Sequence, residues 1–336
     1  MRESNGTNSS VCSFRSEIKV LIAVLSIIVG LELSLHLTGE LLSGNIRHIR
    51  SIIQISNRLS ESDGTCVLFL GNSLTADGVD SSILESELEG SDVTPLAIEK
   101  VTPDGTNLWD WYFIFKNYFA KRKNLPDVLI ICFAWEELND ATPFNAARLG
   151  GYFCSLGDFP ELLELGLSNF KDRAEFSISW ASLLFANRET IRNRLLKKII
   201  PYFQEYTRKI NDMLIVEDRG DLKQLNRRRY IVLGRLLELL KRHKVQIIFA
   251  ALPVVKSYNI DGQLREILEK TKTRLLDCRD IPELSEKMFL DPIHLNDNGS
   301  KIFSHYLAQR LAETLSGVRK ESLDKSVVSD GSALNH

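Results

Sequence analysis

The chain has 336 residues, with 42 Lys and Arg against 44 Asp and Glu, a formal net charge of −2 and a pI of about 6.3. A balance this close to neutral excludes the general attraction to phosphates that drives nucleic-acid binding, so we expect no nucleic-acid partner. Hydrophobic residues make up 44% of the chain, which is enough for one large domain. The five cysteines are an odd number without paired spacing, so no disulfide framework is implied.

The amino-terminal segment is polar over residues 1–17 and mostly apolar over residues 18–37. The apolar run is close to the shortest length that spans a bilayer, and Lys19 and Glu32 interrupt it. The sequence predicts a single transmembrane anchor here. The alternative is an amphipathic helix packed on the folded domain. A removed signal peptide is disfavoured because no A-x-A-like cleavage site follows the apolar run.

The cations that flank the predicted anchor indicate its orientation. Arg2, Arg15 and Lys19 precede or open the apolar run, whereas Arg47 and Arg50 follow it. Positive charge favours the cytoplasmic side, so this difference places the amino terminus inside. We therefore expect the folded domain to lie outside the cytoplasm, in the periplasm or at the cell surface.

Residues 38–64 form a predicted linker, and the spacing of isoleucines over residues 44–63 favours one short amphipathic helix within it. The main domain is predicted over residues 65–315, and residues 316–336 are polar and non-periodic, which is typical of a disordered tail. Within the main domain, the predicted strands are 66–70, 95–98, 127–134, 245–252 and 274–278, and the predicted helices are 81–88, 108–119, 222–243, 261–272 and 298–315. This alternation predicts an α/β fold with a parallel sheet covered on both faces.

Residues 145–220 interrupt the alternation with helical patterns at 177–200 and 202–215. The aromatic residues of this segment are Phe170, Phe176, Trp180, Phe185 and Phe203. A helical insertion after the third strand is expected to lie over the carboxyl edge of the sheet, as a lid or a partner surface. The alternative is a set of additional packing helices whose aromatic residues belong to the core.

The sequence CVLFLGNSLT over residues 66–75 combines an apolar strand with a turn and the start of a helix. A strand that ends at Gly71 leaves the Ser73 hydroxyl at the carboxyl edge of the sheet, where open α/β folds bind ligands. This position suits a nucleophile. The alternative is an ordinary strand-to-helix turn with Ser73 as a helix cap.

A second motif, DPIHL, carries Asp291 and His294 shortly before the last predicted helix. This spacing allows the carboxylate to hydrogen-bond the imidazole, whose other nitrogen is then able to take a proton from a serine. Among the six histidines, only His294 has a carboxylate at this spacing in a predicted edge loop. The alternative is a turn aspartate beside a partly buried histidine.

GNSL and D-x-x-H, in this order, resemble the motifs of the SGNH hydrolases, also called GDSL-type esterases. The resemblance implies a three-layer, flavodoxin-like parallel sheet and a catalytic triad of Ser73, His294 and Asp291. In that family the oxyanion hole is formed by the backbone N–H of the nucleophile, a glycine N–H after the second strand and an asparagine side chain after the third strand.

Two residues are candidates for the remaining oxyanion donors. Gly105 follows the second predicted strand and precedes a helix, which agrees with the family pattern and equally with a plain turn glycine. The third block departs from the pattern, because WEELND replaces G-x-N-D after the strand over residues 127–134. Asn139 comes late in this stretch and is either the third donor or a loop asparagine.

The resemblance implies a serine esterase or O-acyltransferase that acts on acyl esters. With its anchor, the chain is similar to membrane-tethered members such as the alginate O-acetylation proteins and the D-alanyl transfer protein of teichoic acid assembly. These imply an envelope glycan as substrate and a membrane O-acyltransferase as partner. No residue set has metal-ligand spacing and no phosphate loop occurs, so the predicted mechanism uses neither metal nor cofactor. The alternative is a non-catalytic anchored scaffold that binds a glycan or a membrane O-acyltransferase.

Overall fold

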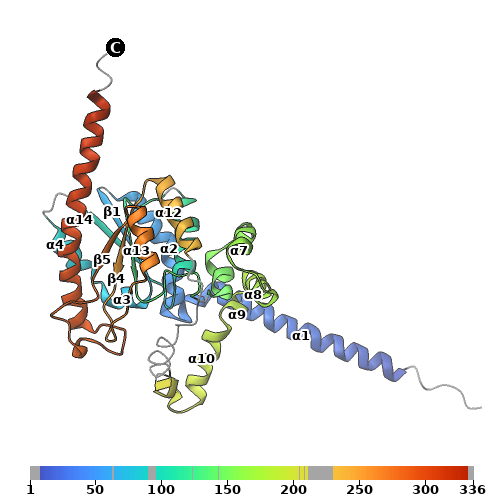
Figure 1. Cartoon of the computed structure of the whole chain (residues 1–336). Helices are drawn as coiled ribbons and strands as arrows, with labels where there is room; N and C mark the ends of the chain where they lie inside the picture. Colours follow the sequence, from blue (N-terminus) through green and yellow to red (C-terminus); the bar gives the residue numbers. More distant parts are fainter. Residues whose placement is uncertain are drawn as a thin grey trace, which may run out of the picture.

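The computed structural model describes residues 8–62, 64–89, 96–122, 124–142, 144–203, 205–207, 209–210 and 230–331. Its centre is a five-stranded sheet with helices on both faces (Figure 1). The strands are β1 (Thr65–Leu70), β2 (Leu96–Val101), β3 (Val128–Phe133), β4 (Gln246–Ala251) and β5 (Arg274–Asp277). Their order in the sheet is β2-β1-β3-β4-β5, and every neighbouring pair is parallel.

The predicted α/β fold is confirmed, and the strand order is the flavodoxin-like one. The five predicted strands are present, although Pro95, the first residue of the predicted second strand, lies outside the described residues. All six residues of β3 are buried, as expected for a central parallel strand covered on both faces. In the sheet, Leu70 pairs with Val101 of β2 and Ile131 of β3, so the carboxyl ends of these strands meet at one edge.

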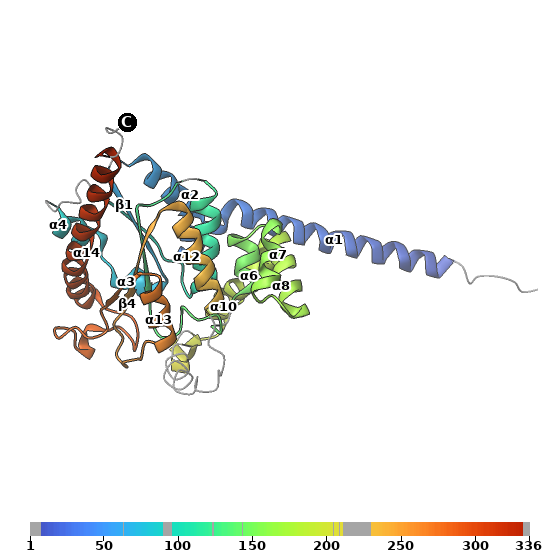
Figure 2. The same cartoon turned by 45° about the horizontal axis from the view of Figure 1, so that its top comes forward.

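The helices packed around the sheet are α2 (Gly44–Glu61), α3 (Ser73–Gly78), α4 (Ser81–Leu88), α5 (Leu108–Ile114), α12 (Ile231–His243), α13 (Gly262–Lys270) and α14 (Asp297–Gly331). Contacts join α14 to α3 and α4 in one layer, and join α12 to α5 in another (Figure 2). The predicted helix over residues 222–243 is described only from Ile231, because residues 222–229 lie outside the described part.

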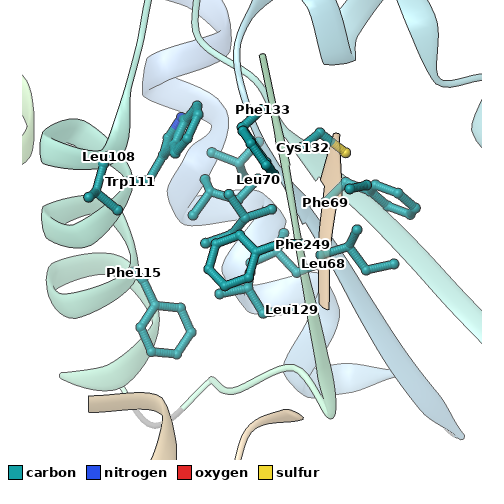
Figure 3. Packing of buried hydrophobic residues seen from close by; sticks show 14 of the residues in the cluster. Leu68, Phe69, Leu70, Leu108, Trp111, Phe115, Leu129, Cys132, Phe133 and Phe249 are labelled. Carbon is teal, nitrogen blue, oxygen red and sulfur yellow. The ribbon is translucent and has the colours of Figure 1, made fainter. Parts of the chain in front are cut away.

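The core is one continuous cluster centred on the sheet (Figure 3). Phe69 of β1, Phe133 of β3 and Phe249 of β4 are completely buried, and α5 adds the buried side chains of Leu108 and Trp111. The predicted helix over residues 108–119 is present, but its second half is the π-helical segment η2 (Phe115–Ala120). Burial of so much aromatic surface fixes α5 beside the carboxyl ends of the strands.

Helix α2 lies in the segment predicted to be a linker and is the amphipathic helix expected there. Its buried side chains are Ile46, Ile49, Ile52, Ile55, Ser56 and Leu59. Apolar residues three and four apart form one stripe on a helix, and here the stripe enters the main core. This helix is therefore integrated into the folded body as firmly as the helices between the strands.

The insertion is helical, as predicted, but its helices are shorter than expected. They are α6 (Ala146–Arg148), α7 (Phe159–Leu165), α8 (Phe170–Ala181), α9 (Leu183–Ala186) and α10 (Arg188–Ile199), with a π-helical segment η3 (Leu149–Phe153) and a 3-10 turn η4 (Leu156–Asp158). A single helix over residues 177–200 is wrong. Ser182 interrupts it, since its hydroxyl accepts the Phe185 N–H and starts α9. Most of the predicted helix over 202–215 lies outside the described residues.

The last helix, α14, differs from the prediction at its carboxyl end. Its backbone is helical to Gly331, whereas the sequence favours a disordered tail over residues 316–336, and residues 332–336 lie outside the described part. The segment VRKESLDKSVVSD contains neither Pro nor Gly and has several good helix formers, so nothing local ends the helix.

Helix α1 (Asn8–Thr38) extends away from the α/β body (Figures 1 and 2). Its stretch Glu17–Leu41 has 25 residues and a mean hydropathy of 2.3, and none of that window is buried in the protein. The helix is therefore long and apolar enough to cross a membrane, a property that a signal sequence shares.

Candidate active site

The turn between β1 and α3 carries the first candidate residue. Ser73 is the first residue of α3, and the helix is capped by Asn72, whose side-chain oxygen accepts the Leu74 N–H at 3.0 Å. A Cβ atom at Gly71 would lie 2.0 Å from Thr75 Oγ1, so only glycine allows this turn to be so tight. The cap expected at Ser73 in the alternative interpretation is supplied by Asn72.

Ser73 and His294 meet at the carboxyl edge of the sheet. The distance from Ser73 Oγ to His294 Nε2 is 2.9 Å, and His294 Nδ1 lies 2.7 Å from Asp291 Oδ2. A carboxylate only accepts hydrogen bonds, so this contact places the imidazole proton on Nδ1 and leaves Nε2 as an acceptor for the serine hydroxyl. The structure thus brings together the three residues predicted as a triad.

The loop before α14 holds Asp291 and His294 in place. One oxygen of Asp291 accepts the backbone N–H groups of Ile293 and His294 at 2.9 and 2.8 Å, and the Leu290 N–H donates to the His294 carbonyl at 2.8 Å. Burial alone raises the pKa of Asp291, but the Ile293 N–H and the imidazole outweigh it, so the pKa is lower than usual. The carboxylate is therefore charged at neutral pH.

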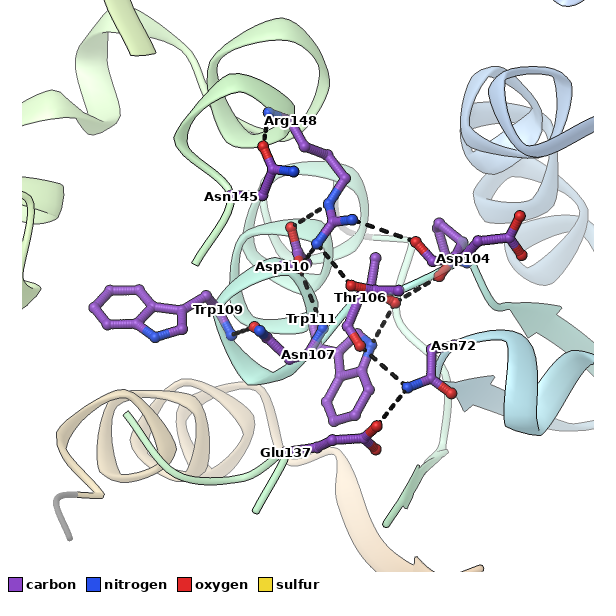
Figure 4. A network of polar contacts seen from close by, with 12 residues as sticks. Asn72, Asp104, Thr106, Asn107, Trp109, Asp110, Trp111, Glu137, Asn145 and Arg148 are labelled. Atoms are coloured by element: carbon purple, nitrogen blue, oxygen red, sulfur yellow. Dashed lines mark hydrogen bonds and ion pairs between the residues drawn. The ribbon is translucent and has the colours of Figure 1, made fainter. Parts of the chain in front are cut away.

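The turn that contains Gly105 is joined directly to the nucleophile turn (Figure 4). The Thr106 hydroxyl lies 2.8 Å from the Gly71 carbonyl oxygen, and Trp111 Nε1 donates to the same oxygen at 3.0 Å. Gly105 has a φ of +62°, a left-handed conformation that favours glycine. The position of Gly105 is therefore fixed by its neighbour Thr106, which contacts the nucleophile turn.

Arg148, the last residue of α6, braces the Gly105 turn from outside (Figure 4). Its guanidinium donates to both oxygens of Asp110, at 2.9 and 2.6 Å, and to the Gly105 carbonyl at 2.9 Å. Asp110 is completely buried and also accepts the Asn107 N–H at 3.1 Å in the capping box of α5. A bidentate pair of this kind fixes the guanidinium and, through it, the turn.

The same turn is held on its other side by α2. His48 Nε2 accepts the Thr102 N–H at 2.8 Å, and the Asn45 side-chain oxygen accepts the Asp104 N–H at 2.9 Å. Burial lowers the pKa of His48, which favours the neutral imidazole that this contact needs. Burial also raises the pKa of Asp104, the nearby Asp77 carboxylate adds to the rise, and the positive charge of Arg148 opposes it.

Glu137, in the turn after β3, is a site residue that sequence analysis missed. Its carboxylate accepts the Asn72 side-chain N–H at 2.8 Å and the Ala134 N–H at 2.8 Å. Asn72 Nδ2 also donates to the Thr106 carbonyl at 3.2 Å, so Asn72 links the turns after β1, β2 and β3 (Figure 4). The signal in the sequence was the second glutamate of WEELND, where the family pattern has other residues.

Asn139 lies further along the turn after β3 and is buried. Its side-chain oxygen accepts the Ala141 N–H at 2.9 Å, and its backbone pairs with Glu136 and Thr142 at 2.8 and 3.0 Å. These contacts are typical of an asparagine that closes its own turn. They agree with the loop interpretation that the sequence left open.

A cavity of about 580 Å³ borders the Gly105 turn and is enclosed by α2 and the insertion. Its charged and amide lining includes Asn45, Arg148, Asp172, Glu175 and Arg188. Side chains of both charge signs and several hydrogen-bonding groups suit a polar ligand with many hydroxyl groups.

No family model matches the chain, and no curated protein matches it. A candidate acylhydrolase from Bacteroides fragilis NCTC 9343 is similar in structure, with 11% identity, a TM-score of 0.38 and coverage of 78% of this chain and 96% of that chain. The acetyl xylan esterase AlAXEase has 13% identity, a TM-score of 0.33 and coverage of 74% and 98%. A gut microbial diltiazem-metabolizing enzyme has 13% identity, a TM-score of 0.32 and coverage of 74% and 47%.

Proposed function

We propose that the chain is a serine esterase or O-acyltransferase of the SGNH type, with Ser73 as nucleophile, His294 as general base and Asp291 as its orienting carboxylate. One observation carries the proposal: a continuous chain of two hydrogen bonds, of 2.9 and 2.7 Å, from Ser73 Oγ through the imidazole to Asp291. This is the arrangement that activates a serine at neutral pH.

In the proposed reaction, Ser73 Oγ attacks the ester carbonyl carbon while its proton moves to His294 Nε2. Asp291 stabilises the imidazolium that forms. The tetrahedral intermediate then breaks its bond to the alcohol oxygen, which takes the proton from Nε2 and leaves an acyl-serine. Water or an acceptor hydroxyl then gives its proton to His294 Nε2 and attacks the acyl-serine. The Ser73 oxygen leaves and takes this proton, and the acyl group is released as an acid or transferred as a new ester.

The proposed oxyanion hole uses the backbone N–H groups of Ser73 and Gly105. The Ser73 N–H opens α3, where the helix dipole favours negative charge, and Gly105 is held by the braces on its turn. Asn139 is the third donor predicted from the family pattern. Its described contacts are those of a turn-closing residue, so the proposal depends on the first two donors.

For substrate and location, we propose an acylated or acylatable envelope glycan and anchorage by α1, with the α/β body outside the cytoplasm. The glycan is proposed by analogy with anchored SGNH proteins, and the length and hydropathy of Glu17–Leu41 support the anchor. By analogy with anchored SGNH proteins, a membrane O-acyltransferase is the proposed partner.

A non-catalytic anchored scaffold, which binds a glycan or a membrane O-acyltransferase, is the second candidate. Glu137 favours it, because this carboxylate contacts Asn72, the residue directly before the nucleophile. A negative charge close to the site of a developing oxyanion opposes its formation.

The test is labelling of the full chain in detergent with a serine-directed fluorophosphonate. We expect labelling of the wild type and of Ser82→Ala, which removes an exposed serine from α4, and no labelling of Ser73→Ala. Absence of labelling in wild-type protein that melts cooperatively would contradict the enzyme and favour the scaffold. An ester assay of the unlabelled protein, with and without a sugar acceptor, then separates transfer from hydrolysis, because only transfer gives an acylated sugar.

A further inference from the structure

The helical insertion is attached at two points, one on α1 and one on the 3-10 turn Gly39–Leu41 that follows it. Glu32 of α1 accepts hydrogen bonds from the Ser182 hydroxyl at 2.8 Å and from the Leu183 and Leu184 N–H groups at 2.5 and 3.1 Å. These N–H groups form the amino terminus of α9, which favours a carboxylate. The second attachment is Arg194 of α10, which donates to the Leu41 carbonyl at 2.8 Å.

These attachments set the level of the insertion relative to a membrane. A carboxylate in the middle of the hydrocarbon costs roughly 3 kcal/mol. Glu32 lies towards the carboxyl end of the apolar stretch Glu17–Leu41 and is paired with α9, which suits the head-group level rather than the centre of the bilayer. The apolar side chains of α1 before it, from Val20 to Leu31, are exposed along the helix. Because α9 contacts α1, and α8 and α10 contact α9, the three helices start beside the end of α1 that joins the α/β body (Figure 1).

Helices α8 and α10, which both contact α9, and the residues that follow α10 expose large apolar side chains, which we call the insertion surface. Its members are Phe170, Ile178, Trp180, Leu195, Ile199, Ile200, Tyr202 and Tyr206. Phe170 is 86% exposed, Ile199 72% and Tyr202 73%. Isolated exposed apolar residues are normal, but a group of this size on neighbouring helices marks an interaction surface.

The composition of this surface suits lipid head groups. Trp180, Tyr202 and Tyr206 are of the residue types that gather at membrane–water interfaces. Lys197 and Lys198 are exposed in the last turn of α10, directly before Ile199. Apolar and aromatic side chains beside lysines, whose long stems reach the head groups, are typical of segments that lie in the plane of the interface.

We propose that the insertion surface is a second membrane contact, which lies in the lipid interface beside the span and fixes the α/β body against the bilayer. This inference rests on the proposed anchor. The occupant is the lipid bilayer itself, because the helices that carry the surface are attached, through Glu32 and Arg194, to the apolar helix and to the turn directly after it. A single span alone leaves the body free to tilt and rotate, whereas a second contact removes this freedom.

Tryptophan emission offers a direct test, since the chain has four tryptophans. Trp109 and Trp111 are buried, Trp135 is half-buried, and Trp180 is 47% exposed on the insertion surface. The full chain and its Trp180→Phe variant are placed in nanodiscs of phosphatidylcholine with brominated acyl chains. Bromine quenches the fluorescence of nearby tryptophans. We therefore expect brominated lipid to quench the Trp180 emission of the wild type, so that its spectrum becomes like that of Trp180→Phe.

The controls separate this surface from the anchor. Phe170→Asp/Ile199→Asp is expected to restore the Trp180 emission in brominated lipid, whereas Ile53→Asp, at a 37% exposed position on α2, leaves the quenching unchanged. Equal quenching of wild type and Trp180→Phe would overturn the proposal and favour a protein partner for this surface. Failure of the chain to co-elute with nanodiscs would overturn the anchor as well, and neither result bears on serine labelling.

Discussion

The two sides of Ser73 are built in different ways. On one side, Asp291 and His294 belong to a single short loop, and the loop's own N–H groups orient the carboxylate. On the other side, the Gly105 turn is held by α2, by α6 and by Asn72 of the turn after β1, through contacts between segments far apart in the chain. The proposed base is therefore oriented by contacts within its own loop, whereas the proposed oxyanion hole depends on contacts between distant parts of the chain.

Removal of the imidazole gives the largest expected effect and tests the local side alone. His294→Ala leaves Ser73 without a proton acceptor and is expected to lower kcat for a small ester on the order of 10⁶-fold, the scale of a triad knockout. Its Tm should stay close to that of the wild type, because the imidazole is on an edge loop. His305→Ala is the control, since this histidine is half-exposed on α14 and pairs with Glu87. Equal kcat values for both variants would contradict the proposed base.

Arg148→Met tests the long-range contacts that hold the Gly105 turn. The buried Asp110 carboxylate then loses its cation, and we expect the free energy of unfolding to fall by about 3–5 kcal/mol, as for a broken buried pair. Urea unfolding of the wild type, Arg148→Met and Arg148→Lys measures it. The lysine keeps a positive charge but lacks the fork that reaches the Gly105 carbonyl, so this variant should be more stable than the methionine variant and still lose kcat.

A loss of stability without any loss of kcat in Arg148→Lys would contradict the view that the proposed oxyanion hole depends on long-range contacts. It would mean that the Gly105 turn keeps its geometry without the guanidinium. A parallel decrease of kcat, with KM unchanged, would instead indicate that the turn acts in the transition state rather than in binding.

The same contrast explains what the sequence was able to predict. Strand β3 is apolar without interruption, and Asp291 and His294 have a spacing that allows their contact, so the sheet and this contact could be inferred from local patterns. The pairing of His294 with Ser73 was inferred from the resemblance to the SGNH motifs. The partners of the Gly105 turn, Arg148 above all, carry no local signal, because an arginine at the end of a short helix is normally a solvated residue. WEELND shows a glutamate in an unusual place, but the contact of Glu137 with Asn72 exists only when the three turns meet, so its role could not be predicted.

An acid titration asks whether the insertion, which carries Arg148, is also held by charge. Asp158 of the insertion binds Lys116 at 2.7 Å; burial opposes its ionisation, but Lys116 and Ser155 lower the pKa of Asp158 to about 2. A lowered pKa stabilises the fold above the ordinary value near 3.8, and the contribution is lost as pH falls through about 2. Asp158→Asn should therefore be less stable than the wild type by about 2 kcal/mol at neutral pH.

Unfolding measured at successive pH values distinguishes this from a simple packing defect. The difference between the wild type and Asp158→Asn should shrink below pH 4 and disappear only below pH 2, because the native carboxyl is half protonated near pH 2 and neutral below it. A difference that is constant with pH would show that the ion pair does not hold the insertion. Glu205→Gln, an exposed carboxylate in an i,i+4 pair with Lys209, is the control and should change little at any pH.

Glu137→Gln gives the smallest expected change in stability and the sharpest comparison of the two sides. The carboxylate accepts N–H groups from Asn72 and Ala134, and an amide has one acceptor oxygen for the two donors. We expect a loss of about 1 kcal/mol in urea unfolding, the net value of one hydrogen bond. Removal of the negative charge also favours an oxyanion, so kcat tells which effect dominates. A rise in kcat despite lower stability would show that the charge of Glu137 slows an active enzyme. A fall in kcat would show that its hydrogen bonds are needed to hold the nucleophile turn.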